Sequence, residues 1–169
     1  LFRSKLVQTS FTVTKIVSLF GLIVFGFIMA KGDVWTANWT DAWSLQKLNV
    51  DGTTTSYVFI AALGAIAAAM VGSIFSSDAW NSVTFIAGEI KNPQRNIGLS
   101  LFLGTLIVTI IYVLANLMYT AVLPVQELAF SDKDRVGVTA ANVIFGNIGT
   151  VIIALMIMVS TFGCNNGLI

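Results

Sequence analysis

Charged residues, histidine and cysteine are scarce in this 169-residue sequence. Only 10% of the residues are charged, histidine is absent, and Cys164 is the one cysteine. An internal disulfide is therefore excluded, as are catalytic triads that need histidine. The net charge of +1 gives no basic patch that would indicate a nucleic-acid partner. The sequence holds no metal-ligand cluster, phosphate loop or nucleophile–base pair, so we expect no enzyme, metal site or cofactor.

Apolar residues, in contrast, make up 56% of the sequence, and the mean hydropathy is +0.87. Soluble domains usually carry about 25% charged residues, and a chain of this length could not hide so much apolar surface from water. Crossing a bilayer takes about 20 apolar residues, and in lipid such stretches form helices. The sequence therefore predicts an all-α, polytopic integral membrane protein with four transmembrane helices, at about 11–30, 57–88, 99–123 and 148–169.

The segments between these stretches are polar and are predicted to be loops: 31–56, 89–98 and 124–147. The two short segments, which are the N-terminal flank and the 89–98 loop, are the basic ones. Positive-inside reasoning therefore favours a cytoplasmic position for Arg3 and Lys91. The sequence starts without Met and ends inside an apolar stretch. We expect residues 1–169 to be an internal fragment of a larger membrane protein.

The second apolar stretch is too long for one straight crossing. A single helix over 57–88 would extend about 48 Å, whereas the hydrocarbon core is about 30 Å thick. Asp78 would then lie near mid-bilayer, where an acid is costly and is typical of a functional site. Its neighbours in "IFSSDAWN" include Ser and Asn, which compete for backbone hydrogen bonds. We therefore expect the helix to break near 76–78; alternatively, Asp78 marks a re-entrant or interfacial turn after a span ending at Phe75.

Polar residues on two other spans fall at a similar depth. Lys15 lies about 15 Å in from Lys5, and Ser160 and Thr161 lie about 17 Å in from Gly149. Together with Asp78 they suggest a shared polar cavity at the midplane. Two local alternatives stay open, because Lys15 can snorkel to the interface and the two hydroxyls can bond their own helix backbone.

Aromatic residues follow the first span. Trp35, Trp39 and Trp43 are typical of an interfacial aromatic belt. In the same segment, Asn38-Trp39-Thr40 fits a glycosylation sequon, which matters only in a eukaryotic secretory pathway.

Three segments carry a resemblance to a known family. "IFSSDAWNSVTFIAGEIKNPQRNI" (74–97) closely resembles the sixth transmembrane helix and following loop of L-type amino-acid transporters, in the amino acid–polyamine–organocation superfamily. The matching residues are Phe75, Trp80, Asn81, Glu89, Asn92, Pro93, Arg95 and Asn96. "FTVTKIVSLFGLIVFGF" (11–27) resembles the fifth helix, and "STFGCNNG" (160–167) the eighth. The resemblance spans the whole chain, which would thus be helices five to eight of one transporter domain.

This resemblance implies a fold of two inverted five-helix repeats, in which the first and sixth helices unwind midway. Exposed backbone at such breaks binds the substrate in discontinuous-helix transporters. Carried over, the substrate site would comprise Phe75, Ser76, Ser77, Asp78 and Asn81. Carbonyl groups around the break would receive the substrate amine, Phe75 would cover the substrate, and Asn81 would line the pocket.

The resemblance also gives Lys15 a role. It occupies the place where sodium-coupled relatives bind an ion between the fifth and eighth helices, opposite Ser160 and Thr161. A fixed cation there implies sodium-independent transport. With the resemblance as a whole, we expect exchange of neutral L-amino acids without sodium. The expected partners are the amino acid and the lipid bilayer, and the expected location is the plasma membrane. A single-pass accessory subunit stays open. The alternatives are a proton-coupled amino-acid symporter and a non-transporting membrane subunit or sensor on the same scaffold.

Overall fold

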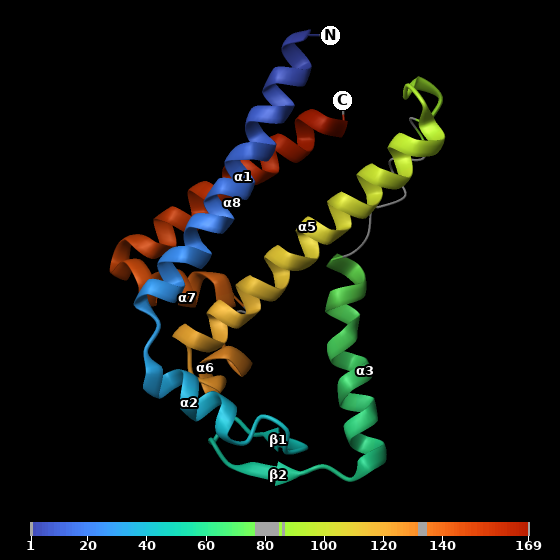
Figure 1. Ribbon diagram of the computed structural model, residues 1–169. Helices are drawn as coiled ribbons and strands as arrows, with labels where there is room; N and C mark the ends of the chain where they lie inside the picture. The colour runs from blue at the N-terminus through green and yellow to red at the C-terminus, as the bar shows by residue number, and fades with distance from the viewer. Residues whose placement is uncertain (1, 77–84, 86, 132–134, 169) are drawn as a thin grey trace. The chain divides into compact units, whose positions relative to one another are not determined.

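The computed structural model describes residues 2–76, 85, 87–131 and 135–168, and these residues are mostly helical (Figure 1). They form two compact units. The first unit combines the chain up to Ala42 with the chain from Ile111 onward, and the second is Trp43–Ile110.

The first unit is built from helices. Helices α1 and α8 lie side by side, and the short helix α7 packs against both (Figure 1). The end of helix α5 completes the unit. The elements are α1 (Phe2–Met29), α2 (Gly32–Thr40), the last part of α5 (Pro93–Val122), α6 (Val125–Ala129), α7 (Val136–Phe145), the 3-10 turn η3 (Gly146–Ile148) and α8 (Gly149–Leu168).

The second unit contains a small antiparallel sheet followed by a helix. Its hairpin turn is closed by Asp51, whose carboxylate accepts hydrogen bonds from the backbone N–H and the hydroxyl of Thr53. The side-chain bond from Thr53 is the main cause that lowers the pKa of Asp51. The elements are β1 (Gln46–Leu48), β2 (Thr54–Ser56), α3 (Phe59–Ser76), the 3-10 turn η1 (Ala87–Glu89) and the first part of α5.

Helix α1 carries several hydroxyl residues in its first half, and they are satisfied within the helix. Ser10, Thr12 and Thr14 each donate to the carbonyl four residues earlier, at 2.8 to 2.9 Å. Lipid offers no other partner to such groups, and bonding back to the helix backbone removes the cost of placing them there. An otherwise apolar helix can therefore tolerate them.

Proline residues mark both ends of α5. The helix begins at Pro93, a first position where the missing N–H costs nothing. Asn92, just before it, has a positive φ of 50°, and the Asn96 amide donates to the Lys91 carbonyl. The helix ends at Val122, because Pro124 cannot continue the hydrogen-bond ladder.

The core of the first unit lies where α1, α5, α7 and α8 meet. Met118 is fully buried there, and Gly26 on α1 lets the Met118 side chain lie directly against the α1 backbone. The Phe25 and Phe145 rings pack edge to face, with centroids 5.8 Å apart. The buried cluster is Leu22, Met118, Val122, Leu123, Ala140, Ala141, Ile144 and Ile153.

Three described stretches are long and apolar enough to cross a membrane: Leu6–Met29, Pro93–Val122 and Val136–Gly163. The third contains the turn at η3. Helix α8 begins after this turn and runs for 20 residues to Leu168, which is long enough to span about 30 Å. Many large apolar side chains on these helices, such as Ile28 and Phe102, remain exposed. A soluble protein rarely exposes such surface, which supports the prediction of a helical membrane protein.

The predicted loops hold more structure than expected. The segment 31–56 contains α2 and the β1–β2 hairpin, so the all-α prediction missed a small sheet, and 124–147 contains α6 and α7. In the second predicted span, α3 ends at Ser76, and the apolar helix Phe59–Ile74 is shorter than the other three stretches. Residues 77 and 78 of the predicted break lie outside the described residues.

The contact at Gly26 predicts a specific packing defect. A Cβ at Gly26 would overlap Cγ and Sδ of Met118 and lie 3.2 Å from Cδ1 of Ile144. We expect Gly26→Ala to lower stability by about 1–3 kcal/mol through overpacking, measured by thermal unfolding of the full-length parent protein in detergent. Gly21→Ala, on the same helix with no atom within 4 Å of its new Cβ, is the matched control.

The double variant Gly26→Ala/Met118→Ala adds a second test. Truncating the Met118 side chain removes the overlap with the new Cβ. The double variant should therefore lose less stability than the sum of the losses of the two single variants. Strict additivity would contradict this packing.

Candidate functional site

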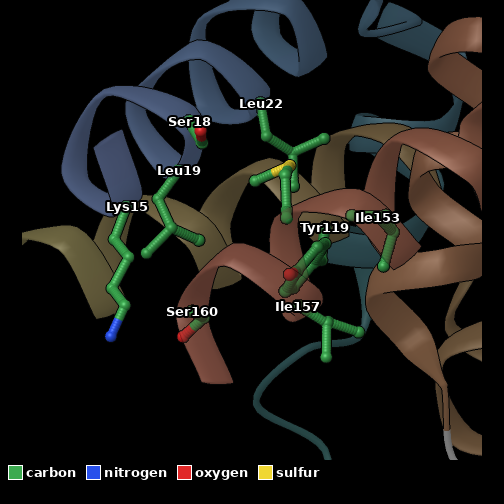
Figure 2. Close-up of a pocket in the computed structure, with 9 residues that line it drawn as sticks. Lys15, Ser18, Leu19, Leu22, Tyr119, Ile153, Ile157 and Ser160 are labelled. Atoms are coloured by element: carbon green, nitrogen blue, oxygen red, sulfur yellow. The ribbon is translucent and has the colours of Figure 1, made fainter. Parts of the chain in front are cut away.

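A cavity of about 190 Å³ lies between α1, the end of α5 and α8, all within the first unit (Figure 2). Its wall is mostly apolar, with one cationic and three hydroxyl side chains. Figure 2 shows Lys15 and Ser160 coming from two different helices to the same side of the cavity. The lining residues are Lys15, Ser18, Leu19, Leu22, Tyr119, Ile153, Met156, Ile157 and Ser160.

Lys15 lies where α1 and α8 approach each other closely. A Cβ placed on Gly163 of α8 would lie 2.9 Å from Cβ of Phe11, and 3.2 Å from both Cε and Nζ of Lys15. Glycine at this position therefore lets the Phe11 Cβ lie against the α8 backbone and leaves room beside it for the half-buried Lys15. The ammonium group is therefore located at the α1–α8 interface.

The two predicted hydroxyl partners of Lys15 differ in their surroundings. Ser160 lines the same cavity as Lys15 and lies one helical turn before Gly163. Thr161 is exposed, and its hydroxyl donates to the Ile157 carbonyl of its own helix at 2.9 Å, which is the local alternative considered from the sequence. The structure thus brings Lys15 and Ser160 to one cavity, while Thr161 is bonded within α8.

The predicted substrate-binding residues lie mainly outside the described part of the chain. Phe75 and Ser76 are the last two residues of α3. Ser77, Asp78 and Asn81 fall outside the described residues. The substrate site therefore stays a prediction from the resemblance.

Two polar residues of the cavity, Ser18 and Tyr119, were not identified from the sequence. Ser18 lies three residues after Lys15, so helical spacing alone could have placed it on the same face. Tyr119 comes from α5 and follows Lys15 by more than a hundred residues, and no sequence spacing indicates that the two line one cavity. Within the described residues, no three His, Cys, Asp or Glu side chains gather as a metal site. The polar groups that line the cavity are one ammonium and three hydroxyls.

Long apolar helices, with a half-buried lysine beside a cavity between two of them, define the class of helical integral membrane proteins. The sequence profile of the amino acid permease family matches residues 2–169. The chain therefore belongs to the amino acid permease family, within the amino acid–polyamine–organocation superfamily, which confirms the resemblance at the family level.

The chain is similar to curated transporters from bacteria and mammals. It is 30% identical to the serine/threonine exchanger SteT of Bacillus subtilis over 161 residues, and 30% identical to the mouse b(0,+)-type amino acid transporter 1 over 166 residues. It is also 27% identical to the mouse large neutral amino acids transporter small subunit 2 over 163 residues. Each alignment covers 95% of this chain. These relatives are transporters, not enzymes.

The chain spans only part of the length of these relatives. It covers 32% of the Bacillus exchanger, 30% of the mouse b(0,+)-type transporter and 28% of the third relative. No solved structure gives a significant match to the chain.

The close approach of α1 and α8 can be tested by cross-linking. Cysteines at Phe11 and Gly163, in the full-length parent protein with Cys164→Ser, should oxidise rapidly to a disulfide, because the corresponding Cβ positions are 2.9 Å apart and a small relaxation reaches the usual ~3.8 Å. The measurement is the loss of maleimide-reactive thiols on mild oxidation and their return on reduction.

The matched control pairs the cysteine at Phe11 with one at Phe162, the neighbouring residue, whose side chain is exposed. This pair should oxidise slowly. Equal rates for the two pairs would show that α1 does not face Gly163 in the intact protein.

Proposed function

We propose that the protein containing this chain exchanges neutral L-amino acids across a membrane without sodium. The observation that carries the proposal is the position of Lys15 at the α1–α8 interface, beside Gly163 and in one cavity with Ser160. Family membership supports amino-acid transport in general. The position of Lys15 supports transport that does not depend on sodium.

The physical basis is a replacement of charge. In sodium-coupled relatives, as the family resemblance implies, an ion between the fifth and eighth helices joins them. An ammonium group on α1 supplies a positive charge and three hydrogen-bond donors at the same place. A permanently attached cation stabilises the helix pair without any ion from solution, and its charge disfavours a second cation nearby.

The names of the relatives support the substrate class and the mode of transport. The Bacillus relative is named an exchanger of serine and threonine, and the third relative a transporter of large neutral amino acids. We infer from these that the substrates are neutral and that one amino acid moves in as another moves out. The substrate would bind at the predicted break, with Phe75, Ser76, Ser77, Asp78 and Asn81 around it.

Location and assembly belong to the same proposal. The third relative is named a small subunit, which supports a larger partner subunit for this protein as well. A transporter of external nutrients would act in the plasma membrane.

Uptake by proteoliposomes that contain the full-length parent protein tests the exchange. Labelled serine, alanine or leucine should enter quickly when the liposomes hold unlabelled amino acid and slowly when they are empty. Replacing sodium by choline outside should leave the rate unchanged, because no sodium ion is bound during the cycle.

Each other outcome of this experiment contradicts the proposal. Uptake that requires an inward pH gradient and no internal amino acid indicates a proton-coupled symporter. If no labelled amino acid is taken up under any condition, the protein is a non-transporting membrane subunit or sensor. A requirement for sodium would remove the role given to Lys15.

The variant Lys15→Ala tests the role of the ammonium. Without it α1 and α8 lose their common charged contact, so exchange should slow by about tenfold or more, equivalent to ~1.4 kcal/mol of barrier. Membrane insertion should persist, because removing a charge from a spanning helix favours the lipid phase. The measurements are initial exchange rate and the amount of inserted protein.

Lys31→Ala is the matched control, since Lys31 is exposed just beyond the end of α1. It removes the same charge and should exchange at the parent rate. Partial recovery of Lys15→Ala by added sodium would support ion replacement, whereas full exchange by Lys15→Ala without sodium would refute it.

A further inference from the structure

Helix α2 has three distinct faces. Val34 and Asn38, one turn apart, form its half-buried stripe. Trp35 and Trp39 form the neighbouring stripe, 38% and 40% exposed, with ring centroids 5.3 Å apart. The polar stripe is exposed and consists of Asp33, Thr36 and Thr40.

Asn38 joins α2 to the end of α5 through three hydrogen bonds. Its Nδ2 donates to the carbonyls of Thr120 and Leu123, both at 2.8 Å. Its Oδ1 accepts from the backbone N–H of Val125 at 3.0 Å. These are long-range contacts, within the first unit, between a short helix and the turn that connects α5 to α6.

Pro124 explains why this turn needs an external amide. In a continuous helix the Thr120 carbonyl would accept from the N–H four residues later, but Pro124 has no N–H. The N–H of Val125, at the start of α6, also lacks a helical partner. One asparagine side chain satisfies both kinds of group, since it carries two donors and an acceptor.

These bonds determine the depth of α2. Thr120 lies in the last turn of a membrane-spanning stretch, and Leu123 directly follows that stretch. The spanning stretch of α1 also ends, at Met29, only three residues before α2 begins. Helix α2 therefore lies at the boundary where both spans leave the hydrocarbon core.

At this boundary the Trp pair separates the protein-facing stripe from the polar stripe. An indole ring has a large apolar body and one N–H donor, and Trp is enriched at the level of lipid headgroups for this reason. The hydroxyls of Thr36 and Thr40 donate to the carbonyls four residues earlier in α2, those of Gly32 and Thr36. The Trp stripe is thus the large apolar surface that α2 offers at headgroup depth.

We propose that α2 is an interfacial docking element: Asn38 fixes it to the end of α5, and Trp35 and Trp39 bind the lipid headgroup region. The inference uses only the membrane spans and does not depend on which substrate is transported. The proposal also means that Asn38 of the sequon Asn38-Trp39-Thr40 has a structural role and carries no glycan. Both of its amide hydrogens already form hydrogen bonds, and glycan attachment would break the α2–α5 contact.

Tryptophan quenching in liposomes tests this docking on the full-length parent protein. The fluorescence of Trp35 and Trp39 is obtained by subtracting the fluorescence of a Trp35→Phe/Trp39→Phe variant from that of the parent protein. It should be quenched most strongly by lipids brominated near the headgroup, and less by lipids brominated at the chain end or by aqueous iodide. Quenching by iodide alone, or shielding from every quencher, would overturn the proposal, since these place the pair in water or against protein.

Two variants test the role of Asn38. Asn38→Asp loses both donors and sets a carboxylate against two carbonyls, so headgroup quenching of the Trp pair should fall and iodide quenching should rise. Thr40→Ala is the matched control: it also destroys the sequon but leaves all three Asn38 bonds, and it should keep the parent quenching. If Thr40→Ala reproduced the Asn38→Asp result, or if deglycosylation of the parent released a glycan from Asn38, the assignment would be wrong.

Discussion

The contact between α1 and α8 at Gly163 is the constraint on which the candidate site depends. A Cβ at this position would overlap the Cβ of Phe11 and would crowd the end of the Lys15 side chain. Since the helices can approach so closely, the ammonium of Lys15 lies between them and not along the outer surface of α1. The same approach brings Ser160 and Ser18 to one small cavity. Small residues allow this kind of packing between membrane helices, where apolar association itself provides little driving force.

Several polar groups in the spanning helices of the first unit have a hydrogen-bond partner close by. Hydroxyls on α1 donate to their own helix. Thr150 on α8 donates to the Asn142 amide oxygen at 3.0 Å. The carbonyl left unpaired by Pro124 receives the Asn38 amide. Lipid offers no substitute for such bonds, so these few polar contacts determine which elements lie together at the ends of the spans.

The sequence predicted the class of protein and the main helices because long apolar runs have few alternatives in a membrane. It also identified Lys15 and Ser160, since both interrupt such runs at similar depth. It did not predict α2, α7 or the hairpin, whose 31–56 and 124–147 segments have the composition of loops. The contacts of Asn38 with Thr120 and of Lys15 with Gly163 join residues more than 80 positions apart, and no periodicity indicates such pairs. Motif resemblance suggested that the two spans meet, while the role of glycine at their contact came from the structure.

A double-mutant cycle on exchange by the full-length parent protein most directly tests whether Lys15 and Ser160 act as a pair across the α1–α8 interface. Lys15→Met keeps most of the side-chain volume and removes the charge, and Ser160→Ala removes the hydroxyl. For residues that share one site, the two losses in exchange rate should be non-additive, with a coupling of about 0.5–3 kcal/mol. Losses that add within error would mean that Lys15 acts without Ser160, and would contradict a shared site between the two helices.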